Sequence, residues 1–148
     1  FTWWLVEKGL LTEEEAKHAS LRDVAWAFGH ISRGMYDAQK HGRPYSQLAS
    51  IQLGHAFKAG VLRWMPEEKA ANGTDTGCFE VDLAKWKPAV TDLEKRVLHI
   101  KGAGDKKDAE ALKASFVDAD DEWAKLRGTI TERWLRAPKA TFVYAVKE

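Results

Sequence analysis

The chain has 148 residues, which is enough for one domain with a hydrophobic core and too few to predict two. Hydrophobic residues make up 45% of it, and this composition excludes an intrinsically disordered chain. The formal net charge of +1 offers no strong field to nucleic acid or to an anionic membrane, and no apolar run is long enough for a membrane-spanning helix.

Two features bear on compartment and chain organisation. The single cysteine, Cys78, cannot form an internal disulfide, so we expect a cytoplasmic protein. The apolar start, with Trp3 beside Trp4, lacks the basic region of a signal peptide. Two adjacent tryptophans at a free end would expose a large apolar surface, so we expect the first residue to lie inside a helix. We therefore interpret residues 1–148 as one helical domain, the C-terminal fragment of a longer protein.

Two helices are predicted before the first strong break in the chain. Residues 1–8 are expected to be the last turns of a helix that Gly9 ends. Thr12, followed three residues later by Glu15, is a capping box that begins a second helix running towards residue 39. Apolar residues at helical spacing predict the buried stripe of this second helix: Leu21, Val24, Ala25, Phe28, Ile31 and Met35.

The middle of the chain predicts a helix followed by a β-hairpin, the unit that the other helices are expected to cover. The helix is expected over residues 46–59. The apolar runs at residues 61–64 and 78–81 are expected to pair, because Asn72-Gly73 between them is a turn sequence. Residues 66–71 are expected to form a helical turn in the loop. The predicted buried face of the helix consists of Leu48, Ile51, Leu53, Ala56 and Phe57.

A fourth helix is expected after the hairpin. Asp82 is expected to cap a short turn that holds Leu83 and Trp86. Pro88 suits the first turn of a helix, where its missing N–H costs nothing, so we expect the fourth helix to begin there and to end near residue 101. Its predicted apolar residues are Val90, Leu93, Val97, Leu98 and Ile100.

Two further helices and a tail complete the prediction. Asp105 is expected to cap a fifth helix that ends at Phe116, and a sixth is expected over residues 122–135. The apolar segment at residues 140–146 has strand propensity and is expected to pack as an extended tail. The predicted fold class is therefore mainly α, with about six helices packed in one domain, a small β-hairpin and an extended C-terminal tail.

The sequence contains no complete catalytic or metal-binding motif. Its five histidines form no HExxH, HxxxH or Cys/His pattern, so a zinc site could arise only from tertiary contacts. Cys78 is expected to be a buried, inert thiol. The loop at residues 72–77 is expected to be a hairpin turn, because it lacks the Gly-Lys-Ser/Thr ending of a phosphate-binding loop; calcium binding through Asp75 is the alternative.

One pair of basic residues could recognise an anion. His55 and Lys58 are one turn apart on the predicted third helix, where together they could hold a carboxylate. The alternative is that both are ordinary solvent-facing residues. Four more residues flank the break between the second and third helices and could line a groove or cover the helix ends: Arg33, Tyr36, Arg43 and Tyr45.

Five segments occur in the order GLLTEEEA, LRDVAWAFGHISRGMYDAQ, YSQLASIQLGHAFKAGVLRW, CFEVDLAKWKPAVTDLEKRVLHIKGAGDKKDAEALKASFVD and FVYAV. This order, with the turn Ile-Lys-Gly-Ala-Gly-Asp at residues 100–105, resembles the C-terminal region of the dipeptidyl-peptidase III family, zinc metallopeptidases of the M49 type, and especially its divergent bacterial branch. The resemblance implies a parent zinc peptidase whose HExxGH-type helix and later acidic motif lie N-terminal to this chain. It also implies that this fragment has no catalytic residue and no metal ligand of its own.

The resemblance further implies contacts with a peptide. In the family, a basic residue on the helix before the β pair contacts the C-terminal side of the peptide, and Lys58 lies near that position, where the family usually has Arg. The Ala-His-Met stretch of the family reads Leu53-Gly54-His55 here. We therefore expect His55, Lys58 and Arg33 to contact substrate, while the chain completes the catalytic lobe and one wall of the cleft. The expected partners are the N-terminal remainder of the parent and its peptide.

The alternative hypothesis is a non-catalytic helical domain that binds other proteins, which the near-neutral charge and the missing metal motifs also fit. If a partner molecule covers the apolar face of the first helix, a homodimer is expected. A nucleic-acid-binding module would need a basic stripe interleaved with aromatic residues, and the chain lacks one.

Overall fold

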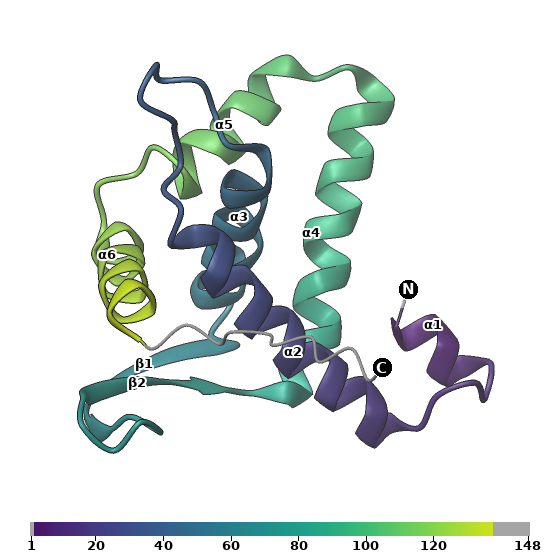
Figure 1. Ribbon diagram of the computed structural model, residues 1–148. Coiled ribbons are helices and arrows are strands. Elements are labelled where there is room, and N and C mark those ends of the chain that lie inside the picture. Colours follow the sequence, from purple (N-terminus) through teal and green to yellow (C-terminus); the bar gives the residue numbers. More distant parts are fainter. Residues whose placement is uncertain (1, 138–148) are drawn as a thin grey trace, which may run out of the picture.

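The computed structural model describes residues 2–137 and confirms a mainly helical fold with a small antiparallel hairpin (Figure 1). Six helices lie in this described part, and the predicted tail at residues 140–146 falls outside it. Helix α3 is central: α2, α4, α5, α6 and the hairpin all contact it. In chain order the elements are α1 (Thr2–Glu7), α2 (Glu13–Ile31), α3 (Pro44–Lys58), β1 (Leu62–Lys69), β2 (Thr76–Val81), α4 (Leu83–Ala103), α5 (Lys106–Phe116) and α6 (Glu122–Arg136).

Helix α2 begins as predicted and ends earlier than predicted. The capping box is formed, with the Thr12 hydroxyl accepting from the Glu15 N–H and the Glu15 carboxylate accepting from the Thr12 N–H. The helix ends at Ile31, eight residues before the expected end, because Gly34 adopts a left-handed conformation (φ +80°). The residues beyond it form a loop closed by an isolated bridge between Tyr36 and Gly42.

The buried stripe of α2 also differs from the prediction. Leu21 is 42% exposed and Ala25 is exposed, whereas Val24 and Ile31 are buried as expected. Most of the residues that α2 does bury are small, and small side chains allow the axes of two helices to approach closely. The buried stripe consists of Ala16, Ser20, Val24, Ala27 and Ile31.

A small residue on α3 likewise allows close packing where α5 and α6 contact this helix. A Cβ atom on Gly54 would lie 2.6 Å from the Phe116 ring and 2.7 Å from the Trp123 indole nitrogen, so the missing side chain admits both rings. Leu53 and Ala56 are buried as predicted, and Leu48 is 44% exposed, contrary to the prediction. Close packing of α5 and α6 on α3 therefore depends on a glycine rather than on large apolar residues.

The hairpin is longer than predicted, and its loop is shorter. The helical turn predicted at residues 66–71 is not formed, because residues 66–69 belong to β1, which extends to Lys69. An irregularity in the pairing lies between Met65 and Lys69, and it accommodates Pro66, which has no N–H for a regular ladder. Two arginines of α6 secure the hairpin: Arg133 donates to the backbone carbonyls of β2, and Arg136 pairs with Asp75 at 2.8 Å.

Helix α4 is one long helix, not a short turn followed by a helix. Asp82 caps it by accepting from the Ala84 N–H, and the helix continues through Pro88 to Ala103. The apolar residues assigned to its core are mostly exposed, with Val90 at 45% and Leu98 at 60%. The reason is that α4 lies at the edge of the domain, where only part of its surface meets α3 and α5 (Figure 1).

The last two helices begin where predicted, the fifth with its predicted cap and the sixth with a cap that had not been predicted. The side chains of Asp105 and Asp121 accept backbone N–H groups at the starts of α5 and α6. Arg96 of α4 holds α5 through two hydrogen bonds to Asp108, at 3.1 Å and 2.6 Å, and these bonds lower the pKa of the Asp108 carboxyl. Within residues 2–137, no helix has both the length and the hydropathy that a membrane crossing requires.

Candidate functional site

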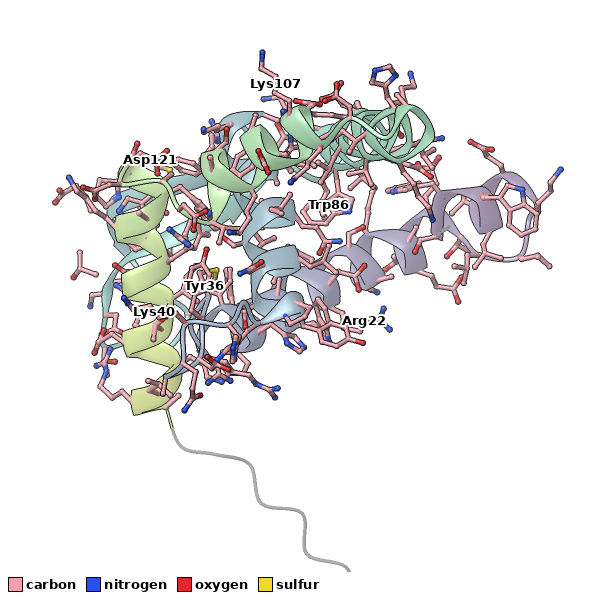
Figure 2. All side chains as sticks on the ribbon, turned by 90° about the horizontal axis from the view of Figure 1, so that it is seen from above. Arg22, Tyr36, Lys40, Trp86, Lys107 and Asp121 are labelled. Carbon is pink, nitrogen blue, oxygen red and sulfur yellow. The ribbon has the colours of Figure 1, made fainter. Side chains whose placement is uncertain are left out.

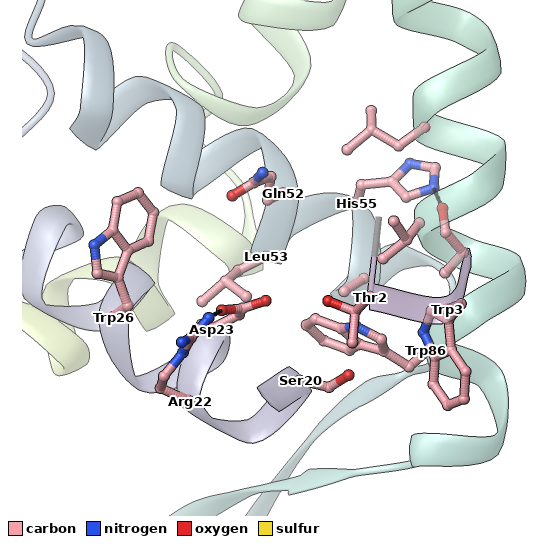
Figure 3. A pocket seen from close by; sticks show the side chains of 14 residues that line it. Thr2, Trp3, Ser20, Arg22, Asp23, Trp26, Gln52, Leu53, His55 and Trp86 are labelled. Atoms are coloured by element: carbon pink, nitrogen blue, oxygen red, sulfur yellow. Dashed lines mark hydrogen bonds and ion pairs between the residues drawn. The ribbon is translucent and has the colours of Figure 1, made fainter. Parts of the chain in front are cut away.

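Two hollows meet at His55 on α3. The larger, about 740 Å³, lies between α1, α2, α3 and α4 (Figure 3). We call it the tryptophan pocket, because Trp3, Trp26 and Trp86 line it together with Leu53, His55 and Leu93. The smaller hollow, about 440 Å³, lies between the C-terminal end of α3 and the first turns of α4. We call it the His55 groove, and its lining includes His55, Lys58, Val61, Lys85, Pro88 and Asp92.

His55 is held in place against α4. Its Nε2 lies 3.1 Å from the Ala89 carbonyl oxygen, so this nitrogen carries the proton and donates. The same nitrogen lies 3.4 Å from the Asp92 carboxylate, and the imidazole and the Phe116 ring form a T-shaped pair with centroids 6.3 Å apart. The side chain is only 17% exposed. In the neutral imidazole, Nδ1 is then an acceptor, which makes His55 a fixed polar group between the two hollows.

Lys58 lies at the edge of the groove, where it has several weak partners. Its ammonium is 4.7 Å above the Phe116 ring, 3.5 Å from the Ser115 carbonyl oxygen and 3.9 Å from the Asp121 carboxylate. The two polar contacts are long, and the side chain is half-exposed. Such contacts orient the ammonium without neutralising it, so Lys58 can still meet an anion.

A second ammonium faces the groove from α4. Lys85 pairs with Asp82 at 3.1 Å, and its hydrogen bond is the main reason that the pKa of the Asp82 carboxyl is lowered. The groove thus combines Lys58 and Lys85 with one carboxylate, Asp92, and with the imidazole of His55. Among the lining residues, two ammonium groups stand against one carboxylate, and a ligand carboxylate would compete with Asp82 for Lys85 and with Asp121 for Lys58.

Arg33 lies apart from this pair. It follows the end of α2, and its backbone N–H donates to His30, whose carbonyl also receives the hydroxyl of Ser46. Ser46 is nine residues before His55 on α3, which corresponds to about 13 Å along the helix axis. Arg33 is exposed and lines neither hollow. The structure therefore brings His55 and Lys58 together and leaves Arg33 near the opposite end of α3.

The other residues near the break support the fold. Arg43 donates to the Tyr36 carbonyl at 3.2 Å, and the Tyr36 hydroxyl donates to Asp118. That hydrogen bond is the main cause of the lowered pKa of the Asp118 carboxyl. Tyr45 packs near His30, with ring centroids 5.5 Å apart. These residues were expected either to line a groove or to cover the helix ends, and their contacts agree with the second interpretation.

The described residues around His55 and Asp75 do not form a set of metal ligands. His55 has one carboxylate beside it, Asp92, and within residues 2–137 no three His, Cys, Asp or Glu side chains come together. The carboxylate of Asp75, the alternative calcium ligand, is hydrogen-bonded to Arg136 and Asn72.

Sequence reasoning missed the contribution of α4 to both hollows. Trp86 points from α4 towards α2 and α3 (Figure 2), and it shares a helix face with Leu93, seven residues later. The fourth helix was predicted to begin at Pro88, so Trp86 and Leu93 were not assigned to the same helix. Asp92 and Lys85, which face His55 and Lys58 across the groove, were hidden for the same reason.

Comparison of the chain with models of protein families, with curated proteins and with solved structures found no match. The site must therefore be interpreted from its own geometry, together with the order of segments described above.

Proposed function

We propose that this chain is the C-terminal helical part of a zinc-dependent peptidase similar to the dipeptidyl-peptidase III family, and that it forms one wall of the peptide cleft. The observation that carries the proposal is the His55 groove, where Lys58 of α3 and Lys85 of α4 line one hollow beside a fixed imidazole. The zinc ligands would belong to the N-terminal remainder of the parent. The proposed compartment is the cytoplasm, since the lone Cys78 can form no internal disulfide.

In this proposal the groove holds the C-terminal side of a peptide. Lys58 exchanges its long contacts with Asp121 and Ser115 for the peptide carboxylate, at small cost, because those contacts are weak. His55, hydrogen-bonded to α4, limits how far the peptide can enter and offers Nδ1 as an acceptor. The role of this chain is therefore to bind and position the substrate.

The first experiment is to determine the intact mass of the native gene product and to read its coding sequence upstream of residue 1. The proposal expects a longer product with a HExxGH-like motif, one bound zinc, and release of dipeptides that a chelator stops and added zinc restores. A product that lacks this motif and releases no dipeptides would refute it.

A matched pair of lysines tests the groove in that gene product. Lys58 and Lys113 are both about half-exposed, both lie over an aromatic ring, and both face an aspartate. We expect Lys58→Met to raise KM about tenfold or more for peptides with a free carboxylate, and to leave KM for their amides unchanged. Lys113→Met should change neither. An unchanged KM in Lys58→Met would exclude the contact.

A second candidate, a helical domain that binds other proteins, is favoured by one observation. On α4, Val90, Val97 and Leu98 are between 44% and 60% exposed, although they are large and apolar. In the homodimer form of this hypothesis, light scattering should show self-association that Leu98→Glu abolishes. A clean monomer at high concentration would exclude this form.

A further inference from the structure

The tryptophan pocket is separate from the groove assigned to the peptide. The two hollows share only His55 and Ala89, and the walls of the tryptophan pocket come from four helices (Figure 3). Its volume, about 740 Å³, lies in the range of small-molecule sites and is large enough for a ligand of several rings. A hollow of this size lined by large apolar side chains is rare among residues that serve packing alone, because protein interiors are close-packed.

Two of its three indole rings, those of Trp26 and Trp3, are held in place by neighbouring side chains before any ligand binds. Trp26 packs against His30, with ring centroids 4.2 Å apart. Trp3 lies beneath the ammonium of Lys87, 5.9 Å from its ring centroid, and Lys87 in turn pairs with Glu7 at 2.8 Å. Prearranged rings reduce the entropy lost on binding, and their faces favour flat aromatic partners.

The polar groups of the pocket define the charge of the ligand. Arg22 and Asp23 line the pocket and form a solvent-exposed ion pair with each other at 2.9 Å, so together they add no net charge to the lining. A charged ligand would lose part of its hydration, and the lining offers no excess of opposite charge in return. Gln52 lines the pocket with an amide that makes no hydrogen bond to another described side chain or backbone group, so its NH2 group remains available as a donor and its carbonyl oxygen as an acceptor.

We propose that the tryptophan pocket binds an uncharged, flat aromatic small molecule that carries a hydrogen-bonding group facing Gln52. The inference rests on the volume of the pocket, on its three indoles and on the absence of net charge from the Arg22–Asp23 pair in its lining, and it does not depend on the peptidase proposal.

Two fluorescent probes that share one aromatic skeleton test the proposal in the whole gene product. N-phenyl-1-naphthylamine is uncharged, and 8-anilino-1-naphthalenesulfonate adds a single sulfonate. We expect the neutral probe to bind saturably at one site per chain, with emission sensitised by tryptophan, and the sulfonate to bind at least tenfold more weakly. Equal binding of the two probes, or no saturable binding of the neutral one, would overturn the proposal.

Two valines of α4 localise the site. Val90 lines the pocket at 45% exposure, whereas Val97 does not line it at 44% exposure. Val90→Trp partly fills the hollow and should weaken binding of the neutral probe at least tenfold, while Val97→Trp should not change it. Circular dichroism and thermal unfolding establish that both variants fold. Folded Val90→Trp that binds the probe like the unchanged protein, or equal weakening in both variants, would exclude this pocket as the site.

Discussion

Ser50 is the buried hydroxyl at which α3, α5 and α6 meet. Its Oγ donates to the Phe116 carbonyl oxygen at 2.6 Å and accepts from the Trp123 indole N–H at 3.1 Å. Ser50 is 0% exposed and Trp123 is 1% exposed, so water cannot replace either bond. The change Ser50→Ala removes one small group and leaves a buried donor and a buried acceptor without their partner.

The cost follows from those two groups. A buried donor or acceptor left without its partner costs about 1–3 kcal/mol, a figure that includes the lost hydrogen bond. Because Ser50→Ala leaves two such groups, we expect it to lower the free energy of unfolding by about 2–6 kcal/mol. For a chain of this length that corresponds to a fall in Tm of about 5 °C or more. The assay is urea unfolding followed by circular dichroism, together with tryptophan fluorescence.

Ser46→Ala is the matched control on the same helix. Ser46 is also buried, at 2% exposed, and among the described residues its hydroxyl donates one hydrogen bond, to the His30 carbonyl oxygen. That oxygen also accepts from the Arg33 N–H, so it keeps a partner when the hydroxyl is removed. We expect this control to cost about 1 kcal/mol.

A double-mutant cycle with Trp123→Phe tests the reasoning further. Removal of the indole donor should cost less in the Ser50→Ala background than in the unchanged protein, by about 1 kcal/mol, because the donor is then already unsatisfied. If Ser50→Ala costs no more than the Ser46 control, or if the cycle shows no coupling, the hydroxyl does not hold these helices together.

Two more predictions concern the hairpin. Gly73 and Gly77 both have a left-handed backbone, with φ +72° and φ +88°. Gly73→Ala should lower the free energy of unfolding by about 1 kcal/mol through the backbone conformation alone, since no atom lies within 4 Å of the added Cβ. Gly77→Ala should lower it by at least about 1 kcal/mol more, because its added Cβ also meets the Trp64 ring. Urea midpoints compare the two variants, and equal losses would contradict the packing argument. The pKa of Asp75 is lowered in the folded protein, mainly by the hydrogen bond from Arg136. The ionised carboxylate therefore stabilises the fold fully above the pKa of the unfolded chain, near pH 4. This stabilisation is lost as the pH falls through the lower pKa of the folded state. The destabilisation caused by Asp75→Asn, measured by urea unfolding from about pH 7 to pH 3, should therefore shrink with acid, and a constant difference would show that the carboxylate charge is not involved.

The candidate site was only partly visible in the sequence. The spacing of His55 and Lys58, one turn apart, correctly placed them at one end of a helix that the structure confirms. The groove also needs Lys85 and Asp92, which come from α4 and have no spacing relation to α3. Arg33 is near in sequence to the break before α3, yet the length of α3 separates it from the pair.

The sequence by itself determined the local features of this protein. Helix starts at Thr12, Asp105 and Asp121 follow from side chains that reach backbone N–H groups within three residues, and this chemistry does not depend on the rest of the fold. The helical class and the existence of the hairpin follow in the same way from short-range patterns.

Only the tertiary structure decided which faces are buried and where the hollows lie. Leu21 and Val90 look like core residues by hydropathy, but they are exposed because no helix covers them, while the small residue Gly54 is buried because two rings pack onto it. Whether a helix face is buried depends on which other element of the chain packs against it, and the hydropathy pattern of that one helix does not identify this element. The tryptophan pocket has the same origin, since its four walls meet only after the helices pack.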